Sequence, residues 1–489
     1  MLFPTFVFAV FFTVVFFIHW RTERFGLFRK VLLLGASLFF YGWWSWKFAL
    51  MLLGSALINH QMAVAISASD DPDRRRRLFR WAVAANLLLL VFFKYTRFLF
   101  VDVLLPLARP LFVQAGGLDL FADGVDEVIP LIDRIILPVG VSFFTFQALS
   151  YVADVYKKTI PPAATSLDFA NYLAFFPQLV AGPIVRACDL LPQMERMPGR
   201  TTAIEANRAI LLILVGLFKK MVVANWLSEH LADRVFAHPE VYCGKDVLLG
   251  VYGYTLQIYC DFSAYSDIAI GTALLLGFHF PINFNAPYFA VTLQEFWRRW
   301  HISLSSWLRD YLYIPMGGGR CGVWRTRMNL LITFLLGGLW HGAGWTFILW
   351  GAFHGFYLSL ERIVRGWFGL SEKPSENPSL GWKILGRIWI FHLAAFAWIL
   401  FRSVDLETVG HVLRQLVVPG TAKLFSARAV LILTIGYLLQ YFDGDGCRAV
   451  LRRLGRLHYF ATAVLAAALL AVILGLAPDG VMPFIYFQF

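Results

Sequence analysis

Two histidines in this sequence have surroundings that suit acyl-transfer chemistry. His341 lies within LLGGLWHGAGW, a glycine-rich apolar segment, and His301 lies within FWRRWHISLSSW, among aromatic and basic residues. A neutral imidazole can accept a proton and return it near physiological pH. Because an ionisable group in an apolar run usually faces a cavity or a partner, His341 is the stronger candidate. For each the alternative is a core histidine, which we favour for His354 in WGAFHG.

Carboxylates inside an apolar block form a second group of candidates. Residues 254–271 read YTLQIYCDFSAYSDIAIG and contain Asp261 and Asp267. Three polar residues at positions i, i+4 and i+8 should face the bundle interior: Gln257, Asp261 and Tyr265. Carboxylates within a membrane normally pair with a cation, and we expect Arg298 or Arg299 to supply it. Such a pair would be structural or would orient a catalytic histidine.

The segment around His301 predicts one amphipathic helix over residues 295–313. At about 100° per residue, apolar side chains form one stripe: Phe296, Trp300, Leu304, Trp307 and Tyr311. A second face carries three polar residues: Arg298, Ser305 and Arg309. His301 falls between the two faces. Such a helix should lie along the membrane surface, with its arginines toward headgroups or an anionic ligand.

The composition excludes a soluble globular protein. Of 489 residues, 59% are hydrophobic and 15% are charged, against about a quarter charged in globular chains. The apolar residues fall in runs that can cross a bilayer, which takes roughly 20 helical residues. They lack the short alternating segments of a transmembrane barrel. We therefore expect an all-α polytopic membrane protein.

Charge and cysteine usage exclude further classes. The net charge of +12 arises from Lys and Arg in short loops between apolar runs, which is typical of the positive-inside rule and not of nucleic-acid binding. The five cysteines are scattered without a CxxC pair, so neither a disulfide framework nor a metal site is expected. HExxH, Walker A and GxSxG motifs are missing from the sequence. MGGGR, which ends at Arg320, could hold a phosphate on backbone N–H groups.

The apolar runs predict about twelve spans, the first of them a retained N-terminal span near residues 2–18. Two crossings fill residues 31–68, with a bend at Gly42. Basic loops, including residues 74–77 and 278–327, predict a cytoplasmic face there and place both termini outside.

Two apolar segments contain residues that are unusual in lipid. Lys219 and Lys220 lie inside the run 207–227 and should face the protein interior or snorkel to the surface. The run 171–186 contains Pro and Gly, which favours a re-entrant segment whose backbone is shielded by protein.

Four motifs together resemble one family: FFPQLVAGP, YCDFSAYSDIAIG, FWRRWHISLSSWLRDYLYIPMGG and GGLWHGAGWTFILWGAFHG. They are similar to the membrane-bound O-acyltransferase family, in its branch of bacterial alginate and polysaccharide O-acetyltransferases. The likeness is sharpest over residues 138–360. We expect a single domain over residues 1–489, in which the spans within 385–476 diverge from the family.

The resemblance implies a fold and a place in the cell. The fold would be a ring of about 11–12 transmembrane helices, with re-entrant and interfacial helices around a central tunnel, in the bacterial inner membrane. His341 would be the catalytic histidine, and His301 would be a second one on the cytoplasmic side of the tunnel. The donor would be an acyl thioester, with acetyl-CoA the expected substrate and no bound cofactor. The acceptor would be a polysaccharide or a periplasmic partner protein that relays the acetyl group.

These roles suggest a mechanism. His341 would act as general base on an acceptor hydroxyl or would carry the acetyl group itself. Trp340 or His301 would position the thioester, and Asp261 or Asp267 would support the charge. The donor phosphates would lie near one or more arginines: Arg298, Arg309 and Arg320.

Two alternatives stay open at this point. A transporter or flippase for an acyl donor or polymer would share the polar residues within the membrane, although the sequence lacks the internal repeat that many transporters show. Within the family, the acceptor could be peptidoglycan, cellulose, a lipid or a protein instead of an alginate-like exopolysaccharide.

Overall fold

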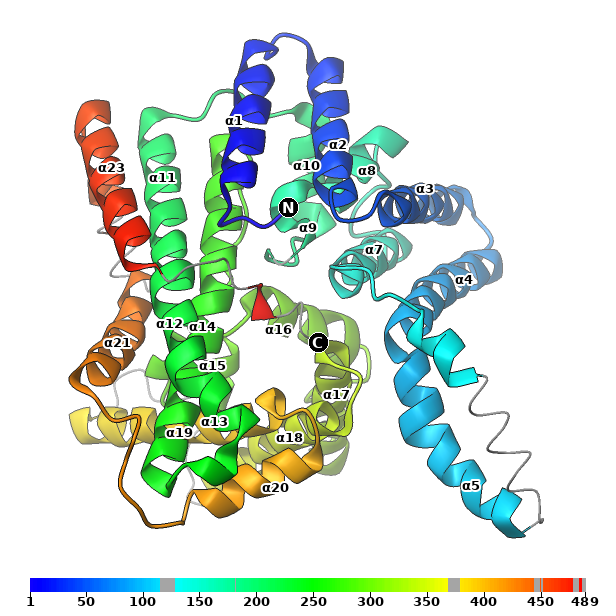
Figure 1. Cartoon of the computed structure of the whole chain (residues 1–489). Coiled ribbons are helices and arrows are strands. Elements are labelled where there is room, and N and C mark those ends of the chain that lie inside the picture. The colour runs from blue at the N-terminus through cyan, green and yellow to red at the C-terminus, as the bar shows by residue number, and fades with distance from the viewer. Residues whose placement is uncertain are drawn as a thin grey trace.

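The protein is an all-helical bundle in the part of the chain that the structure describes. This part of the computed structural model covers residues 1–114, 128–180, 182–367, 379–443, 449, 452–477 and 483–485, and it contains helices and turns but no strand. Figure 1 shows the helices arranged around a centre that contains α9 and α16. The expected all-α class is confirmed.

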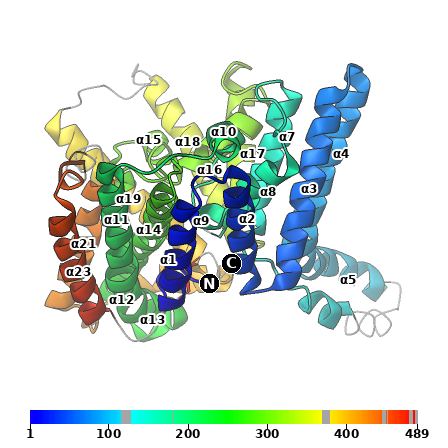
Figure 2. The same ribbon diagram turned by 90° about the horizontal axis from the view of Figure 1, so that it is seen from above.

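The first half of the chain supplies the helices on one side of this centre. Helices α1 and α2 form a hairpin, and π-helical turns at Val91–Tyr95 and Phe98–Leu104 continue α4 toward α5. Figure 2 shows Met1 on the opposite side of the bundle from α10. The bounds are α1 Phe6–Arg21, α2 Gly26–Gly42, α3 Trp46–Ala68, α4 Pro72–Leu90, α5 Leu105–Gln114, α7 Val141–Tyr156, α8 Ser166–Ala174, α9 Phe176–Leu179 and α10 Ala187–Arg196.

The second half contains the segments that carry the candidate histidines. Helix α11 continues through π-helical turns into α12 and α13, and it packs along α14. The bounds are α11 Ala203–Leu217, α12 Asn225–Leu227, α13 Asp233–Ala237, α14 Gly244–Leu275, α15 Leu293–Trp297, α16 Ile302–Leu308, α17 Val323–His341, α18 Trp345–Trp367, α19 Leu380–Arg402, α20 Leu406–Gln415, α21 Ala427–Leu438 and α23 Tyr459–Leu476.

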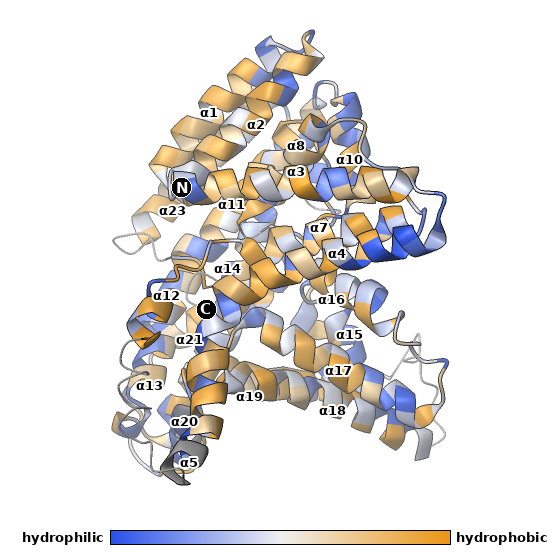
Figure 3. Cartoon of the chain, turned by 90° about the vertical axis from the view of Figure 1, so that its right-hand side faces the viewer, coloured by the Kyte–Doolittle hydropathy of each residue, from blue (hydrophilic) through white to orange (hydrophobic). Residues whose placement is uncertain are grey.

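Fewer helices have the length and composition of a membrane span than the apolar runs predict. Within the described residues there are 5 such helices, with two shorter apolar helices, at Phe6–Arg21 and Ala427–Tyr441. The 5 are Trp46–Ala68, Pro72–Tyr95, Ala203–Ala237, Leu380–Arg402 and Tyr459–Leu476. Helices α14, α17 and α18 are long enough but not apolar enough, because they bury polar side chains inside the bundle. Figure 3 shows hydrophilic residues gathered at the start of α4 and hydrophobic residues along its later turns.

The segment 171–186 is irregular and buried, as expected of a shielded re-entrant segment. Its described residues are interrupted after α8 and again after α9, and residue 181 lies outside the described part. Side chains from other elements bind its backbone. The N–H of Phe176 donates to Ser37 Oγ at 3.1 Å, and the N–H of Ile184 donates to Ser303 Oγ at 3.0 Å. These contacts satisfy amides that would otherwise be unpaired.

Lysines neutralise the carboxylates of α14, and the expected pairing with Arg298 or Arg299 is wrong. Lys220 Nζ lies 2.6 Å from Asp261, and Lys219 Nζ lies 2.9 Å from Asp267. Both lysines are buried in the π-helical turns that follow α11, beside α14. Their position confirms that they face the protein interior.

Arg299 and Lys219 each bind one further carboxylate. Arg299 pairs with Glu295 at 2.7 Å, which holds it in the turn that follows α15. Lys219 Nζ also lies 2.6 Å from Asp443, so one ammonium joins two carboxylates. The carboxylates of Asp261 and Asp267 are therefore paired with cations, as expected within a membrane. The cations are lysines because the chain that continues α11 packs beside α14.

Candidate active site

A tight hairpin of α17 and α18 places His341 inside the bundle. A Cβ atom at Gly338 would overlap the carbonyl oxygen of Phe347, and one at Gly351 would overlap that of Phe334. Only glycine permits this approach of the two backbones. His341 is the last residue of α17, and the chain turns at Gly342 before α18 begins.

His341 lies among aromatic rings at the wall of a small cavity. Its ring centroid is 4.9 Å from that of Trp340, 5.0 Å from Trp350 and 5.2 Å from Phe401. The side chain is 4% exposed. With Lys94 and Ser142 it lines a cavity of about 110 Å³. This volume suits a small group and excludes a long chain.

A left-handed turn forms part of the wall of this cavity. Gly140 precedes α7 with φ +76°, and a Cβ there would lie 2.5 Å from the carbonyl oxygen of Leu179. Glycine is therefore required at the point where the loop before α7 meets α9.

His301 lies at a break between two helices, so the expectation of one helix over residues 295–313 is wrong. Helix α15 ends at Trp297, His301 has φ +41°, and α16 begins at Ile302. Asn283 supports the break with two hydrogen bonds. Its backbone carbonyl accepts the N–H of Ile302 at 2.9 Å, and its side-chain Oδ1 accepts the hydroxyl of Ser303 at 2.8 Å. A hydrogen-bonding partner from a preceding loop cannot be read from helical periodicity.

The structure places both His301 and His341 beside Trp340. The His301 ring is 6.1 Å from Trp340, and Trp340 is 4.9 Å from His341. His301 is fully buried, and its Nδ1 lies 3.2 Å from Asn283 Oδ1. The predicted group of two histidines and one tryptophan therefore has a common location.

The three polar residues expected on one helical face do line one pocket. A pocket of about 310 Å³ between α15, α16, α17 and α18 is bordered by Arg298, Ser305 and Arg309. Arg362 and Arg365 of α18 also border it, which the sequence did not suggest because they follow the histidine motif by several turns. Arg320 is not among its lining residues.

The arginines of this pocket differ in how they are paired. Arg309 binds Asp310 at 2.6 Å, and Arg186 binds the same carboxylate at 2.6 Å. Burial alone would raise the pKa of Asp310, but these hydrogen bonds hold its pKa below the ordinary value. Within the described residues no acid lies at ion-pair distance from Arg298, so its charge is available to an anion.

A line of aromatic side chains connects this pocket to His341. Trp297 borders the pocket and lies 5.1 Å from His354. His354 lies 4.7 Å from Trp350, which is 5.0 Å from His341. His354 is 1% exposed, and in the described part of the chain neither of its ring nitrogens has a hydrogen-bond partner. A core histidine was expected here, and the ring is buried among aromatic side chains.

A larger cavity lies next to the small one, on the side of Met1. It measures about 670 Å³, and its wall includes Met1, Trp43 and Trp44. It shares three lining residues with the cavity beside His341: Leu137, Val139 and Val180. His341 therefore has two adjoining cavities on its Met1 side, and a row of ring contacts joins it to the arginine pocket.

Asp261 and Asp267 occupy a different place from the one expected. Both carboxylates are bound by the lysines of the turns after α11, and Asp261 also accepts the N–H of Ile485 at 2.8 Å. The contacts of these two carboxylates are therefore with lysines and a backbone N–H, and not with His301 or His341. Their neighbour Phe262 does touch His301, with ring centroids 4.5 Å apart.

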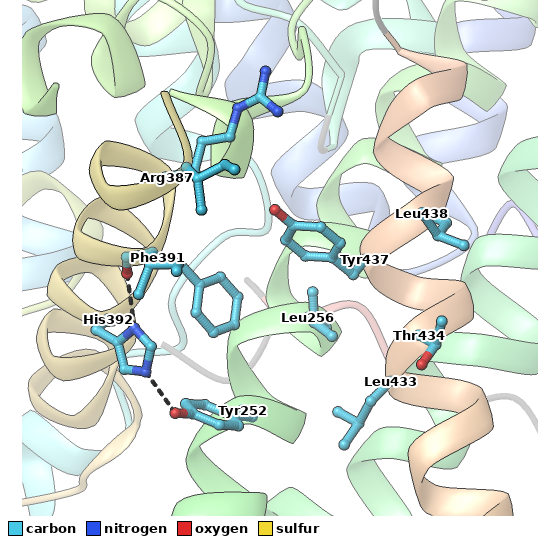
Figure 4. A pocket seen from close by; sticks show the side chains of 11 residues that line it. Tyr252, Leu256, Arg387, Phe391, His392, Leu433, Thr434, Tyr437 and Leu438 are labelled. Carbon is cyan, nitrogen blue, oxygen red and sulfur yellow. Dashed lines mark hydrogen bonds between the residues drawn. The ribbon is translucent and has the colours of Figure 1, made fainter. Parts of the chain in front are cut away.

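A further groove lies away from His301 and His341. It measures about 470 Å³, lies between α14, α19 and α21, and is mostly apolar. Figure 4 shows His392 at one end, bound to Tyr252 at 2.7 Å, and Arg387 at the other. None of the predicted site residues lines this groove.

The sequence analysis missed Lys94, which binds the last turn of α17. Lys94 Nζ donates to the carbonyl of Trp340 at 2.6 Å and to that of His341 at 2.9 Å. The signal was available, because Lys94 is a cation within the apolar run LLLLVFFKY.

Comparisons with known proteins show which family this chain belongs to. Residues 38–402 match the model of the membrane-bound O-acyltransferase family. A probable alginate O-acetylase of Pseudomonas aeruginosa is 38% identical over 85% of this chain and 76% of its own length. One from Pseudomonas putida is 35% identical over 94% and 95%. A peptidoglycan O-acetyltransferase of Helicobacter pylori is 36% identical over 80% and 74%.

The matched range contains both candidate histidines, the arginine pocket and Lys94. It covers most of the described helical bundle, and the relatives are aligned over more than two thirds of their own lengths. The chain is therefore a multi-pass member of the membrane-bound O-acyltransferase family and an O-acyltransferase.

Proposed function

We propose that this enzyme transfers an acetyl group from a cytoplasmic thioester to a hydroxyl on the outer side of the bacterial inner membrane. The acceptor is an exopolysaccharide of the alginate type, a proposal supported by the two relatives named as probable alginate O-acetylases. Peptidoglycan is the second candidate acceptor, because of the Helicobacter pylori relative.

The observation that carries this proposal is the position of His341 between two approaches. On one side lies the cavity of about 670 Å³ at Met1, here called the outer cavity. It shares the lining residues Leu137, Val139 and Val180 with the small cavity beside His341. From the other side, His354 and Trp350 link His341 to the arginine pocket. A base in this position can meet a donor and an acceptor that never share an aqueous compartment.

The charge distribution supports the orientation. The arginines at the start of α4 and those of the pocket lie at loops that the positive-inside rule assigns to the cytoplasm. Met1 and the outer cavity then face the periplasm.

The reaction needs one proton acceptor and one activated acyl group. His341 takes the proton of the acceptor hydroxyl while the oxygen attacks the thioester carbonyl carbon. A C–O bond forms and the C–S bond breaks. The leaving thiolate receives the proton back from His341, which yields an O-acetyl ester and a free thiol. Trp340 and His301 hold the thioester, and the acceptor hydroxyl belongs to the glycan or to a periplasmic partner protein that relays the acetyl group.

The arginine pocket is expected to bind the phosphates of acetyl-CoA. Arg298→Gln removes a cation with no acid partner, so the KM for acetyl-CoA should rise about tenfold or more, since a hydrogen bond to a charged group contributes about 1.5–3 kcal/mol. The kcat should change little. The matched control is Arg320→Gln, which lies outside the pocket and should leave KM unchanged. Equal KM values for the wild type and Arg298→Gln would contradict this assignment.

Thiol release tests the proposed function directly. Inverted membrane vesicles expose the cytoplasmic face, so acetyl-CoA is added outside and free thiol is measured there. The expected result is thiol release that depends on this protein, with ester-linked acetyl recovered in the polysaccharide of the lumen. A transporter or flippase would move its cargo without thiol release, and that outcome would exclude acetyl transfer.

A further inference from the structure

We propose that Lys94 is a positioning residue that holds the His341 ring in place for acyl transfer. This inference rests on the proposed function, because it assigns a task to a residue that contacts His341 through its backbone. Lys94 lines the same small cavity as His341, Trp340 and Ser142.

Three consecutive carbonyls at the end of α17 are bound from one neighbouring turn. Tyr95 OH donates to the carbonyl of Leu339 at 2.7 Å, and Lys94 Nζ donates to those of Trp340 and His341 at 2.6 and 2.9 Å. Helix ends leave their last carbonyls without intrahelical partners. These carbonyls carry partial negative charge, so a cation binds them favourably.

The donors belong to an unusual element. Lys94 and Tyr95 end the π-helical turn Val91–Tyr95, which directly continues α4. A single π-helical turn within an α-helix often marks a functional site. Here the turn directs two adjacent side chains, Lys94 and Tyr95, to the last carbonyls of α17.

An ordinary helix cap would not have the same effect. The N–H of Gly342 already closes the local turn on Gly338 O, at 3.3 Å. Lys94 adds a connection to a different helix, 246 residues earlier in the chain than Trp340. Its ammonium also lies 6.0 Å from the centroid of the Trp340 ring and 3.5 Å from Ser142 Oγ. Burying a cation is costly, and these contacts offset that cost at the point where His341 must be held.

Three variants and one control test this role. Lys94→Met keeps most of the length of the unbranched side chain and removes the donor. Its kcat for thiol release from acetyl-CoA, measured in inverted vesicles, should fall on the order of 10²-fold, as expected for a misplaced catalytic group. The KM for acetyl-CoA should stay within about twofold, because the arginine pocket is untouched. Lys94→Arg should recover at least a tenth of the wild-type kcat, since it restores cationic donors.

The control, Arg97→Gln, removes an exposed cation one turn later on the same helix and should keep the wild-type kcat. The third variant, Tyr95→Phe, removes only the bond to Leu339 and should lower kcat by a smaller factor. It keeps the inference testable if Lys94→Met does not accumulate in the membrane.

Three results would overturn the inference: wild-type kcat in folded Lys94→Met, wild-type kcat in Tyr95→Phe when Lys94→Met does not accumulate, or a loss in Lys94→Met that appears in KM alone. Full activity of His341→Ala would instead overturn the proposed function.

Discussion

Replacing His341 with alanine is expected to abolish acetyl transfer. The substitution removes the only imidazole that lines the small cavity among its described residues. A positioned general base contributes about 10²–10⁴-fold to the rate, so the kcat should fall by at least that factor. Thiol release in inverted vesicles and ester-linked acetyl on the polysaccharide measure the loss.

The variant must remain inserted for this result to have meaning. His341 is surrounded by Trp340, Trp350 and Phe401, so alanine leaves a cavity and His341→Gln is the better-filled companion variant. Both should reach wild-type levels in the membrane. His392→Gln is the matched control, because His392 lies in the groove of Figure 4, away from the site, and should keep wild-type activity. Acetylation at wild-type rate in both His341 variants would end the proposal.

Local composition predicted the class of the fold and the types of residue at the site. In a long apolar run, a helix satisfies every backbone hydrogen-bonding group within the bilayer. The segment around His341 is rich in glycine, and in the structure Gly338 and Gly351 let the backbones of α17 and α18 approach closely. The motifs also indicated the family. These features depend on neighbouring residues in the chain, so one sequence is enough to read them.

Features that depend on distant residues could not be read in this way. The break at His301 needs Asn283, and the cations for Asp261 and Asp267 come from α11 and its continuation. Periodicity alone favoured an unbroken helix and a nearby arginine. Lys94 is a different case, because its place in an apolar run was visible and only its partner on α17 was not.

The buried pair of Lys220 and Asp261 is expected to give the largest effect on stability. Its side chains are each 3% exposed, with Nζ 2.6 Å from the carboxylate. Lys220→Met leaves Asp261 buried without its cation, and breaking a buried pair in this way costs about 3–5 kcal/mol. The unfolding midpoint of the purified protein in detergent, followed by size-exclusion chromatography after heating, should therefore drop clearly.

The double variant Lys220→Met with Asp261→Asn separates charge from packing. It removes both charges, so no unpaired carboxylate remains, and the midpoint should recover a large part of the loss. The side-chain amide that replaces the carboxylate keeps a carbonyl oxygen, which can still accept the N–H of Ile485. Arg97→Gln breaks an exposed pair with Asp133, whose side chains are 62% and 48% exposed, and should shift stability by less than about 1 kcal/mol. If Lys220→Met unfolds at the same temperature as Arg97→Gln, the charge of Lys220 does not stabilise the contact between α11 and α14, and this account of the buried carboxylates fails.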